Sequence, residues 1–367
     1  MNKPIGILTF HRASNYGAVL QAYALQAAFG NIGQKAVIVD YYCPVVEEDH
    51  RPLGLFKRHK IPQAILRFPI KAHKDRLFNA FRKRKLVTSA PVDPKSISSI
   101  ADSYSLFVSG SDQVWSDRFS GLDPAYMLDF AREEQRYSYA CSFGFDAFPA
   151  GKEEVYLKLL RGIRCISLRE SSGVEMLEKA GLKAHTDLDP TLLLSAEEWR
   201  SFSAAPAEKD PYILVYTVNG DVHLLEYARA LSEKKGCKIL YLNNQYKNNR
   251  DLKRIRYASP EEFVGWFANA EYVLTNSFHG TAFSIIFHRK FKVELETKKK
   301  YNVRSRDLLL NCGLSDCILK NGSEDFSFTG DWGEPDRLLG NMREKSVSYI
   351  RMISDRAEEI GKVHVAE

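Results

Sequence analysis

The segment TNSFHGTAFSIIF (275–287) holds one histidine, His279, between two apolar stretches. The stretch that ends before it predicts a buried strand, and the stretch after it predicts a helix that begins near Gly280. A helix N-terminus offers N–H groups and the positive end of the helix dipole, so this turn favours an anion. Ser277 and Thr281 add hydroxyls, and a glycine allows close backbone approach. We therefore predict an anion-binding turn around His279. A capped turn in which His279 bonds a carbonyl is the structural alternative.

Polar residues follow other predicted strands in the same way. His11, Asn15 and Tyr16 lie in a turn between the apolar run IGILTF and a helix, Asp112 follows the run SLFVS, and Arg169 follows CISL. Ligands of parallel sheets bind beyond the carboxyl ends of the strands, so these residues are expected at an active edge. Structural roles stay open for three of them. His11 could cap the first turn, Asp112 could hold its own loop as an Asx turn, and Arg169 could form an interdomain ion pair.

Several common site motifs are missing from the chain. No GxGxxG or GxxxxGK[ST] loop is present, which argues against a dinucleotide site and a P-loop. A GxSxG elbow and an HExxH helix are also missing. The six cysteines are scattered without a CxxC pair, so we expect no metal site and no bound cofactor. They are Cys43, Cys141, Cys165, Cys237, Cys312 and Cys317.

The elements that must position these residues alternate between strands and helices. IGILTF predicts a strand, AVLQAYALQAAFGNIG a helix that ends at Gly33, and KAVIVDYY the next strand, which together make a βαβ unit with a parallel sheet. The segment Ser203–Pro211 has the composition of a linker, and a second α/β set follows it. We predict an α/β fold of two Rossmann-like, doubly wound domains that face a cleft. The predicted parts are an N-terminal domain over 1–195, a C-terminal domain over 211–330, and a helix over 331–367 that packs back on the first domain.

Composition bounds the class of protein. The chain has 367 residues, 44% of them hydrophobic and 27% charged, which is ordinary for a globular protein of about two domains. IGILTF is too short for the apolar region of a signal peptide, and no run of about 18 apolar residues exists. We therefore expect a cytoplasmic protein without a transmembrane helix.

One segment carries much of the positive charge. Between Arg51 and Lys85 lie twelve Lys or Arg residues and one acid, Asp75. Leu77, Phe78 and Phe81 would share one face of a helix there, with cations around them. This pattern suits peripheral contact of 51–85 with a membrane or a phosphorylated acceptor. It suits a solvated basic face on a helix packed against its own domain equally well. No nucleic-acid motif accompanies the charge, so we expect no nucleic-acid partner.

The motifs together carry a family resemblance. GILTFHRASNYGAVLQAYALQ opens the chain, VSGSDQVW and SLRE…SGVEMLEKAG…LDPTLLL follow, and TNSFHGTAFSII comes late. In this order, over about residues 5–315, they resemble the polysaccharide pyruvyl transferase family. The resemblance implies a GT-B-like fold. It also implies transfer of an enolpyruvate-derived group from phosphoenolpyruvate to a sugar of a surface or capsular polysaccharide, or of its lipid-linked precursor.

The resemblance also implies roles for particular residues. His279 would be the general acid or a ligand of the donor phosphate, because histidine changes charge near neutral pH. Many family members have an arginine two residues before this histidine, where this chain has Ser277. Arg304, Arg306 and Arg169 are the candidates to supply that charge. Arg306 is favoured among them, because the pattern around it also resembles the family.

The remaining roles complete a donor side and an acceptor side. Ser277, Gly280 and Thr281 would bind donor oxyanions, with Arg306 and Arg169 pairing with phosphate or carboxylate. Asp112 would be the base that deprotonates the acceptor. The acceptor would be lined by His11, Asn15 and Tyr16. Two other functions stay open on the sequence alone: a nucleotide-sugar glycosyltransferase, which shares the implied architecture, and a non-catalytic protein that binds a glycan lipid.

Overall fold

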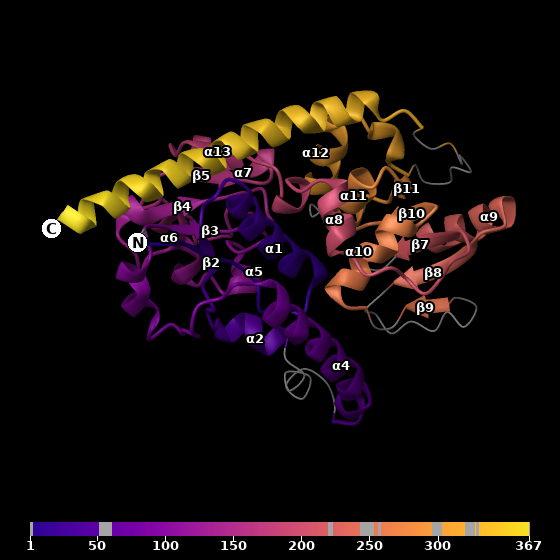
Figure 1. Cartoon of the computed structure of the whole chain (residues 1–367), viewed down its shortest axis with the longest axis horizontal. Helices are drawn as coiled ribbons and strands as arrows, with labels where there is room; N and C mark the ends of the chain where they lie inside the picture. Colours follow the sequence, from indigo (N-terminus) through magenta and orange to yellow (C-terminus); the bar gives the residue numbers. More distant parts are fainter. Residues whose placement is uncertain are drawn as a thin grey trace. The chain divides into compact units, whose positions relative to one another are not determined.

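The chain forms two compact α/β units (Figure 1). The computed structural model describes residues 3–50, 61–218, 223–242, 253–255, 258–295, 303–319, 327 and 330–366, so residues 51–60 of the basic segment lie outside the described ranges. Unit 1 comprises Met1–Leu193 and Met342–Glu367, and unit 2 comprises Leu194–Asn341. The boundary between them falls at Leu193, and the segment predicted as a linker lies inside unit 2.

Unit 1 is built on a parallel sheet in the order β2-β1-β3-β4. Its strands are β1 (Ile5–Leu8), β2 (Ala36–Ile38), β3 (Phe107–Ser109) and β4 (Arg136–Ser138). Residue Ile7 aligns with Ile38 on one side and Val108 on the other, and all three are fully buried. Strands β5 (Ile166–Leu168) and β6 (Ala184–Thr186) pair in parallel, and bridges from Tyr137 and Cys141 join β5 to β4.

Helices and short turns connect these strands. The helices of unit 1 are α1 (Tyr16–Asn31), α2 (Pro44–His50), α4 (Ile61–Lys85), α5 (Asp117–Ser120), α6 (Glu153–Leu160) and α7 (Ser171–Lys179), with 3-10 turns at Ile97–Ser103, Pro124–Met127, Glu133–Gln135 and Pro190–Leu192. The side chain of Asn15 caps α1 by accepting the N–H of Ala18, and Gly33, with a φ of 81°, follows its end. The βαβ unit predicted from the opening sequence is present, because β1 and β2 pair in parallel across α1.

Unit 2 is built on a parallel sheet in the order β11-β10-β7-β8-β9. Its strands are β7 (Tyr212–Tyr216), β8 (Lys238–Leu242), β9 (Lys253–Ile255), β10 (Tyr272–Thr275) and β11 (Lys290–Val293). Its helices are α8 (Ala196–Phe202), α9 (Leu224–Lys235), α10 (Pro260–Asn269), α11 (Phe278–Ile286) and α12 (Val303–Asn311), with a 3-10 turn at Ser315–Cys317. The capping box predicted at Ser259 and Glu262 is confirmed at the start of α10.

The chain ends in α13 (Gly333–Ala366), whose residues from Met342 onward belong to unit 1. In that unit the Tyr349 hydroxyl donates to the carbonyl of Ser138, and the Ser346 hydroxyl accepts the N–H of Leu188. The last part of the predicted C-terminal helix therefore packs on the sheet of unit 1. Among the described residues, no helix combines the length and apolarity needed to span a bilayer.

Candidate functional site

Polar residues gather where the parallel strands of unit 1 end. Thr9 and His11 follow β1, Ser111 and Asp112 follow β3, Ser142 follows β4, Arg169 and Glu170 follow β5, and Asp189 follows β6. The chain passes from β1 to β2 on one side and later enters β3 on the other side of β1. The carboxyl ends of β1 and β3 therefore mark a topological switch point, which is where ligands of such sheets bind.

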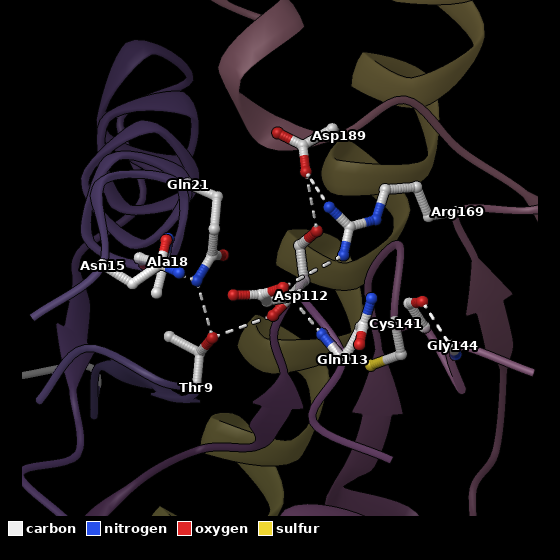
Figure 2. A network of polar contacts seen from close by, with 12 residues as sticks. Thr9, Asn15, Ala18, Gln21, Asp112, Gln113, Cys141, Gly144, Arg169 and Asp189 are labelled. Carbon is white, nitrogen blue, oxygen red and sulfur yellow. Dashed lines mark hydrogen bonds and ion pairs between the residues drawn. The ribbon is translucent and has the colours of Figure 1, made fainter. Parts of the chain in front are cut away.

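A chain of hydrogen bonds spans this edge (Figure 2). The amide of Gln21 donates to Thr9 Oγ1 at 2.8 Å, and that hydroxyl donates to the carbonyl of Ser111 at 2.9 Å. The Ser111 hydroxyl donates in turn to Asp189 Oδ2 at 3.2 Å, and Arg169 Nη1 donates to the same oxygen at 2.7 Å. The network ties α1 and the strand ends into one polar layer, which fixes the positions of Arg169 and Asp112.

Asp112 is the acid of this layer that keeps contact with solvent. Its side chain is 18% exposed, and its Oδ1 accepts the N–H of Gln113 at 2.9 Å and lies 3.5 Å from Arg169 Nη2. Within the described ranges no hydrogen bond reaches its other carboxylate oxygen. Its φ of 78° is left-handed, a strained conformation for a residue other than glycine that is concentrated at functional sites. The structure therefore places a carboxylate oxygen of Asp112 where a ligand can reach it.

Arg169 holds two carboxylates rather than standing alone at the edge. Its side chain is 2% exposed, and it pairs with Asp189 and Asp112. Burial lowers the pKa of a guanidinium, but the charges of Asp189 and Asp112 outweigh that effect and raise the pKa of Arg169. The predicted donor cation therefore lies beside the predicted base, in the interior of the network.

Glu170 fastens the loop after β4. Its Oε1 accepts the Ser142 hydroxyl at 2.8 Å and the Phe143 N–H at 3.1 Å, and its Oε2 is buried without a hydrogen-bond partner among the described residues. Cys141 lies just before this loop, and its thiol donates to the carbonyl of Ser109. Burial raises the pKa of Cys141 to about 12, and a contact with the Ser109 hydroxyl opposes that increase. This thiol stays protonated, so it is no nucleophile.

His11 forms a second polar group at the ends of β1 and β2. Its Nδ1 lies 3.1 Å from the carbonyl of Thr9, and its Nε2 lies 2.9 Å from Asp40 Oδ1. Arg12 also bonds Asp40 and pairs with Glu47. Burial alone would raise the pKa of Asp40, but the hydrogen bonds and charges of His11 and Arg12 lower it to about 2. His11 is 1% exposed, so it lies in the interior of this cluster.

The two other predicted acceptor residues lie at the start of α1. Asn15 is exposed, and its side chain caps the helix. Tyr16 is 4% exposed, and its ring packs on Phe78 of α4 at 5.1 Å. Lys74 Nζ lies 5.4 Å from the centre of the Tyr16 ring, and burial together with the charge of Lys71 lowers the pKa of Lys74 to about 8. Asn15 is therefore exposed at the start of α1, whereas the Tyr16 ring lies in the interface with α4.

His279 lies at the corresponding switch point of unit 2. The sheet order places β10 on one side of β7 and β8 on the other, so the chain reverses direction between β7 and β10. His279 stands in the first turn of α11, directly after β10, and is half-buried. The side chain of Asn276 accepts the N–H of Val218 at 2.9 Å, which links the ends of the two strands. The predicted strand, turn and helix around His279 are all present.

The other predicted residues of this turn make bonds within it. Ser277 caps α11, because its hydroxyl accepts the Gly280 N–H at 3.4 Å, while the Thr281 hydroxyl donates to the carbonyl of Ser277 at 3.0 Å. A Cβ on Gly280 would stand 2.3 Å from Thr275 Oγ1. Close approach at this glycine is therefore to the end of β10. Burial raises the pKa of Tyr216, and a hydrogen bond with Ser277 opposes that increase.

The two arginines of α12 differ in their surroundings. Arg304 is half-buried, and its guanidinium carbon lies 5.8 Å from the centre of the Phe278 ring. That ring meets the His279 ring edge-on at 5.2 Å between centres. Arg306 is exposed. The structure thus brings Arg304, rather than the favoured Arg306, to the residue next to His279.

The sequence patterns did not identify several polar residues of unit 1. Thr9, Gln21 and Asp189 belong to the hydrogen-bonded network, and Asp40 belongs to the group around His11. Asp189 lies in the LDPT segment that carried part of the resemblance. Thr9 and Asp40 lie one or two positions after buried strands, Asp189 lies three positions after β6, and Gln21 lies on the buried side of α1. Gln21 is the clearest signal among them, because it is fully buried in a helix that otherwise buries apolar residues.

Comparisons with known proteins bear on the fold and the family. A protein described as a UDP-N-acetylglucosamine 2-epimerase from Listeria monocytogenes has a TM-score of 0.51 and 9% identity, over 95% of this chain and 90% of that chain. The UDP-GlcNAc 2-epimerase of Neisseria meningitidis has a TM-score of 0.47 and 9% identity, over 99% of this chain and 98% of that chain. The first likeness concerns the fold alone, and it confirms the predicted GT-B-like α/β fold.

No curated protein matches the sequence. The family profile for polysaccharide pyruvyl transferases, however, matches residues 15–291. This range begins at the cap of α1 and ends in β11, so it takes in the His279 turn and the members of the unit 1 network from Gln21 onward. The match covers more than half of the chain. The protein therefore belongs to the polysaccharide pyruvyl transferase family of transferases.

Proposed function

We propose that this protein transfers the enolpyruvate-derived group of phosphoenolpyruvate to a sugar of a surface or capsular polysaccharide, or of its lipid-linked precursor, and forms a pyruvate ketal. The position of His279 carries the proposal. It stands half-buried at a helix N-terminus, beyond the carboxyl end of β10, inside the range that matches the family. Such a place favours a phosphorylated, anionic donor.

The chemistry assigns a proton donor and a proton acceptor. His279 donates a proton to the methylene carbon of the donor or binds its phosphate, and protonation leaves positive charge at C2. A sugar hydroxyl then bonds C2, and Asp112, whose side chain is 18% exposed, accepts the proton of that hydroxyl. The bond from C2 to the phosphate oxygen breaks, and phosphate leaves. A second sugar hydroxyl bonds C2 to complete the ketal, its proton passes to the His279 imidazole that gave one to the methylene carbon, and the proton on Asp112 passes to the released phosphate. Phosphoenolpyruvate is a co-substrate in this scheme, and no cofactor or metal ion takes part in it.

Cations must hold the donor while this happens. The turn at Ser277, Gly280 and Thr281 faces the donor oxyanions, and an arginine of α12 supplies the charge that Ser277 lacks. The contact between Arg304 and Phe278 supports Arg304 for this role, while the exposed Arg306 remains the choice from sequence. Arg169, paired with Asp112, holds the base in place. His11, Asn15 and Tyr16 lie on the acceptor side.

The test is release of phosphate from phosphoenolpyruvate with a galactoside or mannosamine acceptor. His279→Ala should lower kcat at least a hundredfold, because proton transfer by a positioned side chain contributes about 10²–10⁴-fold. His288→Asn is the matched control: His288 lies in the same unit, is partly exposed, and has a positive φ that asparagine tolerates. Activity of His279→Ala within tenfold of wild type, with the fold intact, would refute the assignment.

Further variants separate the remaining roles. Asp112→Asn keeps the left-handed backbone and removes the charge, so it should lower kcat with little change in the melting temperature. Arg304→Ala and Arg306→Ala are compared for the donor KM, and the larger increase identifies the donor cation. Thermal shift with phosphoenolpyruvate and with a panel of nucleotide sugars tests the donor class. Stabilisation by a nucleotide sugar alone would favour a glycosyltransferase. Binding of an acceptor without phosphate release would favour a non-catalytic protein.

A further inference from the structure

The outward face of α4 changes from apolar to basic along its length. Ile61 and Ile65, one turn apart, are 67% and 59% exposed. Pro62 and Pro69 are exposed beside them, and His73, Arg76 and Lys83 are exposed further along the helix. At about 100° per residue, these positions share a third of the helix surface. We call this surface the α4 face. It presents an apolar end followed by cations on one side of one helix.

The opposite side of α4 is already covered by unit 1. Phe78 and Phe81 are fully buried, and their rings lie 5.1 Å from Tyr16 and 6.5 Å from Tyr23 of α1. The apolar side predicted from sequence is therefore an internal packing surface. The exposed isoleucines lie on the other side of the helix, whose N-terminal half extends away from the sheet of unit 1 (Figure 1).

Negative charge is absent from the α4 face as the structure describes it. The acid of this helix, Asp75, accepts a hydrogen bond from Ser14 of the turn before α1 at 3.1 Å and from Asn79 at 2.9 Å. Its charge is therefore directed toward α1. The face joins exposed aliphatic side chains to cations of one sign, which is the pattern of a helix that lies in a membrane interface.

We propose that the α4 face docks unit 1 on the surface of an anionic lipid bilayer. Ile61 and Ile65 enter the boundary between headgroups and acyl chains, and Arg76 and Lys83 contact headgroup phosphates. From Ile61 to Lys83 the helix extends about 33 Å, at about 1.5 Å per residue, so both ends reach a flat surface together. A second copy of the chain fits this face less well, because a symmetric pair would bring like charges together.

Vesicle flotation of the full chain tests the proposal. Wild-type protein should float with vesicles of phosphatidylcholine and phosphatidylglycerol, bind pure phosphatidylcholine at least tenfold less, and lose binding as NaCl rises. Ile61→Asp with Ile65→Asp should lower the partition at least tenfold, because aspartate cannot enter the acyl boundary. Arg76→Glu with Lys83→Glu should lower it as much and weaken its salt dependence.

Matched controls come from α6 of the same unit. Val155→Asp with Lys158→Glu changes an apolar residue, 47% exposed, and an exposed lysine in the same way, and should leave the partition unchanged. The circular dichroism and melting temperature of every variant should equal those of wild type, because all the replaced side chains are exposed. Equal floating of wild type and the isoleucine variant would overturn the proposal. Loss of binding in the charge variant alone would do so too, because it would show electrostatic attachment to the headgroups without insertion of the isoleucines.

A second readout measures depth. Ile65→Trp places a fluorophore on the α4 face, and its emission, taken as the difference from wild type, should shift to shorter wavelength on anionic vesicles and be quenched by lipids brominated near the headgroup. The same substitution at Val155 should show neither effect. Unshifted, unquenched emission from Ile65→Trp on vesicles that hold the protein would contradict insertion at this face.

Discussion

At the scale of residues, hydrogen bonding separates Asp189 and Asp40 from Asp112, because the side chains of Asp40 and Asp112 are about equally exposed, at 19% and 18%. Asp189 is fully buried, and it accepts bonds from Ser111, Arg169 and Thr191. Asp40 is held by His11 and Arg12. The side chain of Asp112 is 18% exposed, and its φ of 78° is left-handed. Because residues other than glycine in this conformation are concentrated at functional sites, Asp112 is the acid to test for catalysis.

Asp40 yields a prediction about pH. Its pKa falls from 3.8 to about 2 on folding, so its contribution to stability is complete above about pH 4 and is lost as the pH falls through about 2. Asp40→Asn should lower the free energy of unfolding at pH 7 by about 1–2 kcal/mol, a range discounted for partial exposure. The difference in the free energy of unfolding between Asp40→Asn and wild type, measured by urea unfolding, should become smaller as the pH falls from 4 to 2.

The exposed Asp355 provides the control for this measurement. Asp355→Asn should change the free energy of unfolding by less than about 0.5 kcal/mol at every pH. A deficit of Asp40→Asn that stays constant from pH 7 to pH 2 would show that the carboxyl does not titrate in this range on folding.

At the scale of elements, α11, which carries His279, packs closely against β10 at Gly280. Ser277 caps α11, and its signal is a serine before an apolar helix, which the sequence shows. The need for glycine at position 280 comes from Thr275 Oγ1, which sits where a Cβ would be. From the sequence alone, Gly280 was expected to allow a ligand to approach the backbone. The structure gives another reason for glycine at this position, because α11 packs against β10 there.

Gly280→Ala should therefore destabilise unit 2. The added methyl group would force α11 away from β10, and overpacking of this kind costs about 1–3 kcal/mol. Gly340→Ala in α13 is the matched control, because nothing lies within 4 Å of its added Cβ. That change should be neutral or stabilise the helix by about 0.5–1 kcal/mol. Chemical unfolding of the two variants measures both effects, and equal stabilities would contradict the close approach at Gly280.

At the scale of the whole molecule, unit 1 is assembled from both ends of the chain. Ile350, Ile353 and Ala357 of α13 are buried, and the Ser354 hydroxyl donates to the side chain of Gln34 at 2.9 Å. The sequence predicted a C-terminal helix that packs back, from its position and pattern. Which residues it covers depends on backbone groups more than 150 positions away, such as the carbonyl of Ser138 and the N–H of Leu188.

Ile353→Ala tests this assembly. Ile353 is fully buried, so the change should lower the free energy of unfolding by about 2–5 kcal/mol through lost burial and a cavity. Leu310→Ala, at a side chain that is 50% exposed, should cost less than about 1 kcal/mol. Both are measured by urea unfolding. A similar small cost for both variants would show that α13 contributes little to unit 1.

The sequence by itself determined the alternation of strands and helices, because the apolar period and the caps are local signals. It therefore predicted the βαβ start, the capping box at Ser259, and the turn that carries His279. It also carried the motifs of the polysaccharide pyruvyl transferase family, and the family match confirms that resemblance.

Tertiary structure decided which polar groups meet. The pairing of Arg169 with Asp112 and Asp189, the bond from His11 to Asp40, and the approach of Arg304 to Phe278 join residues from different elements. Only the order of strands in a sheet brings such ends together, and that order is not a local property of the chain. For the same reason, periodicity identified an apolar side on α4, while packing against α1 decided which side of that helix remains exposed.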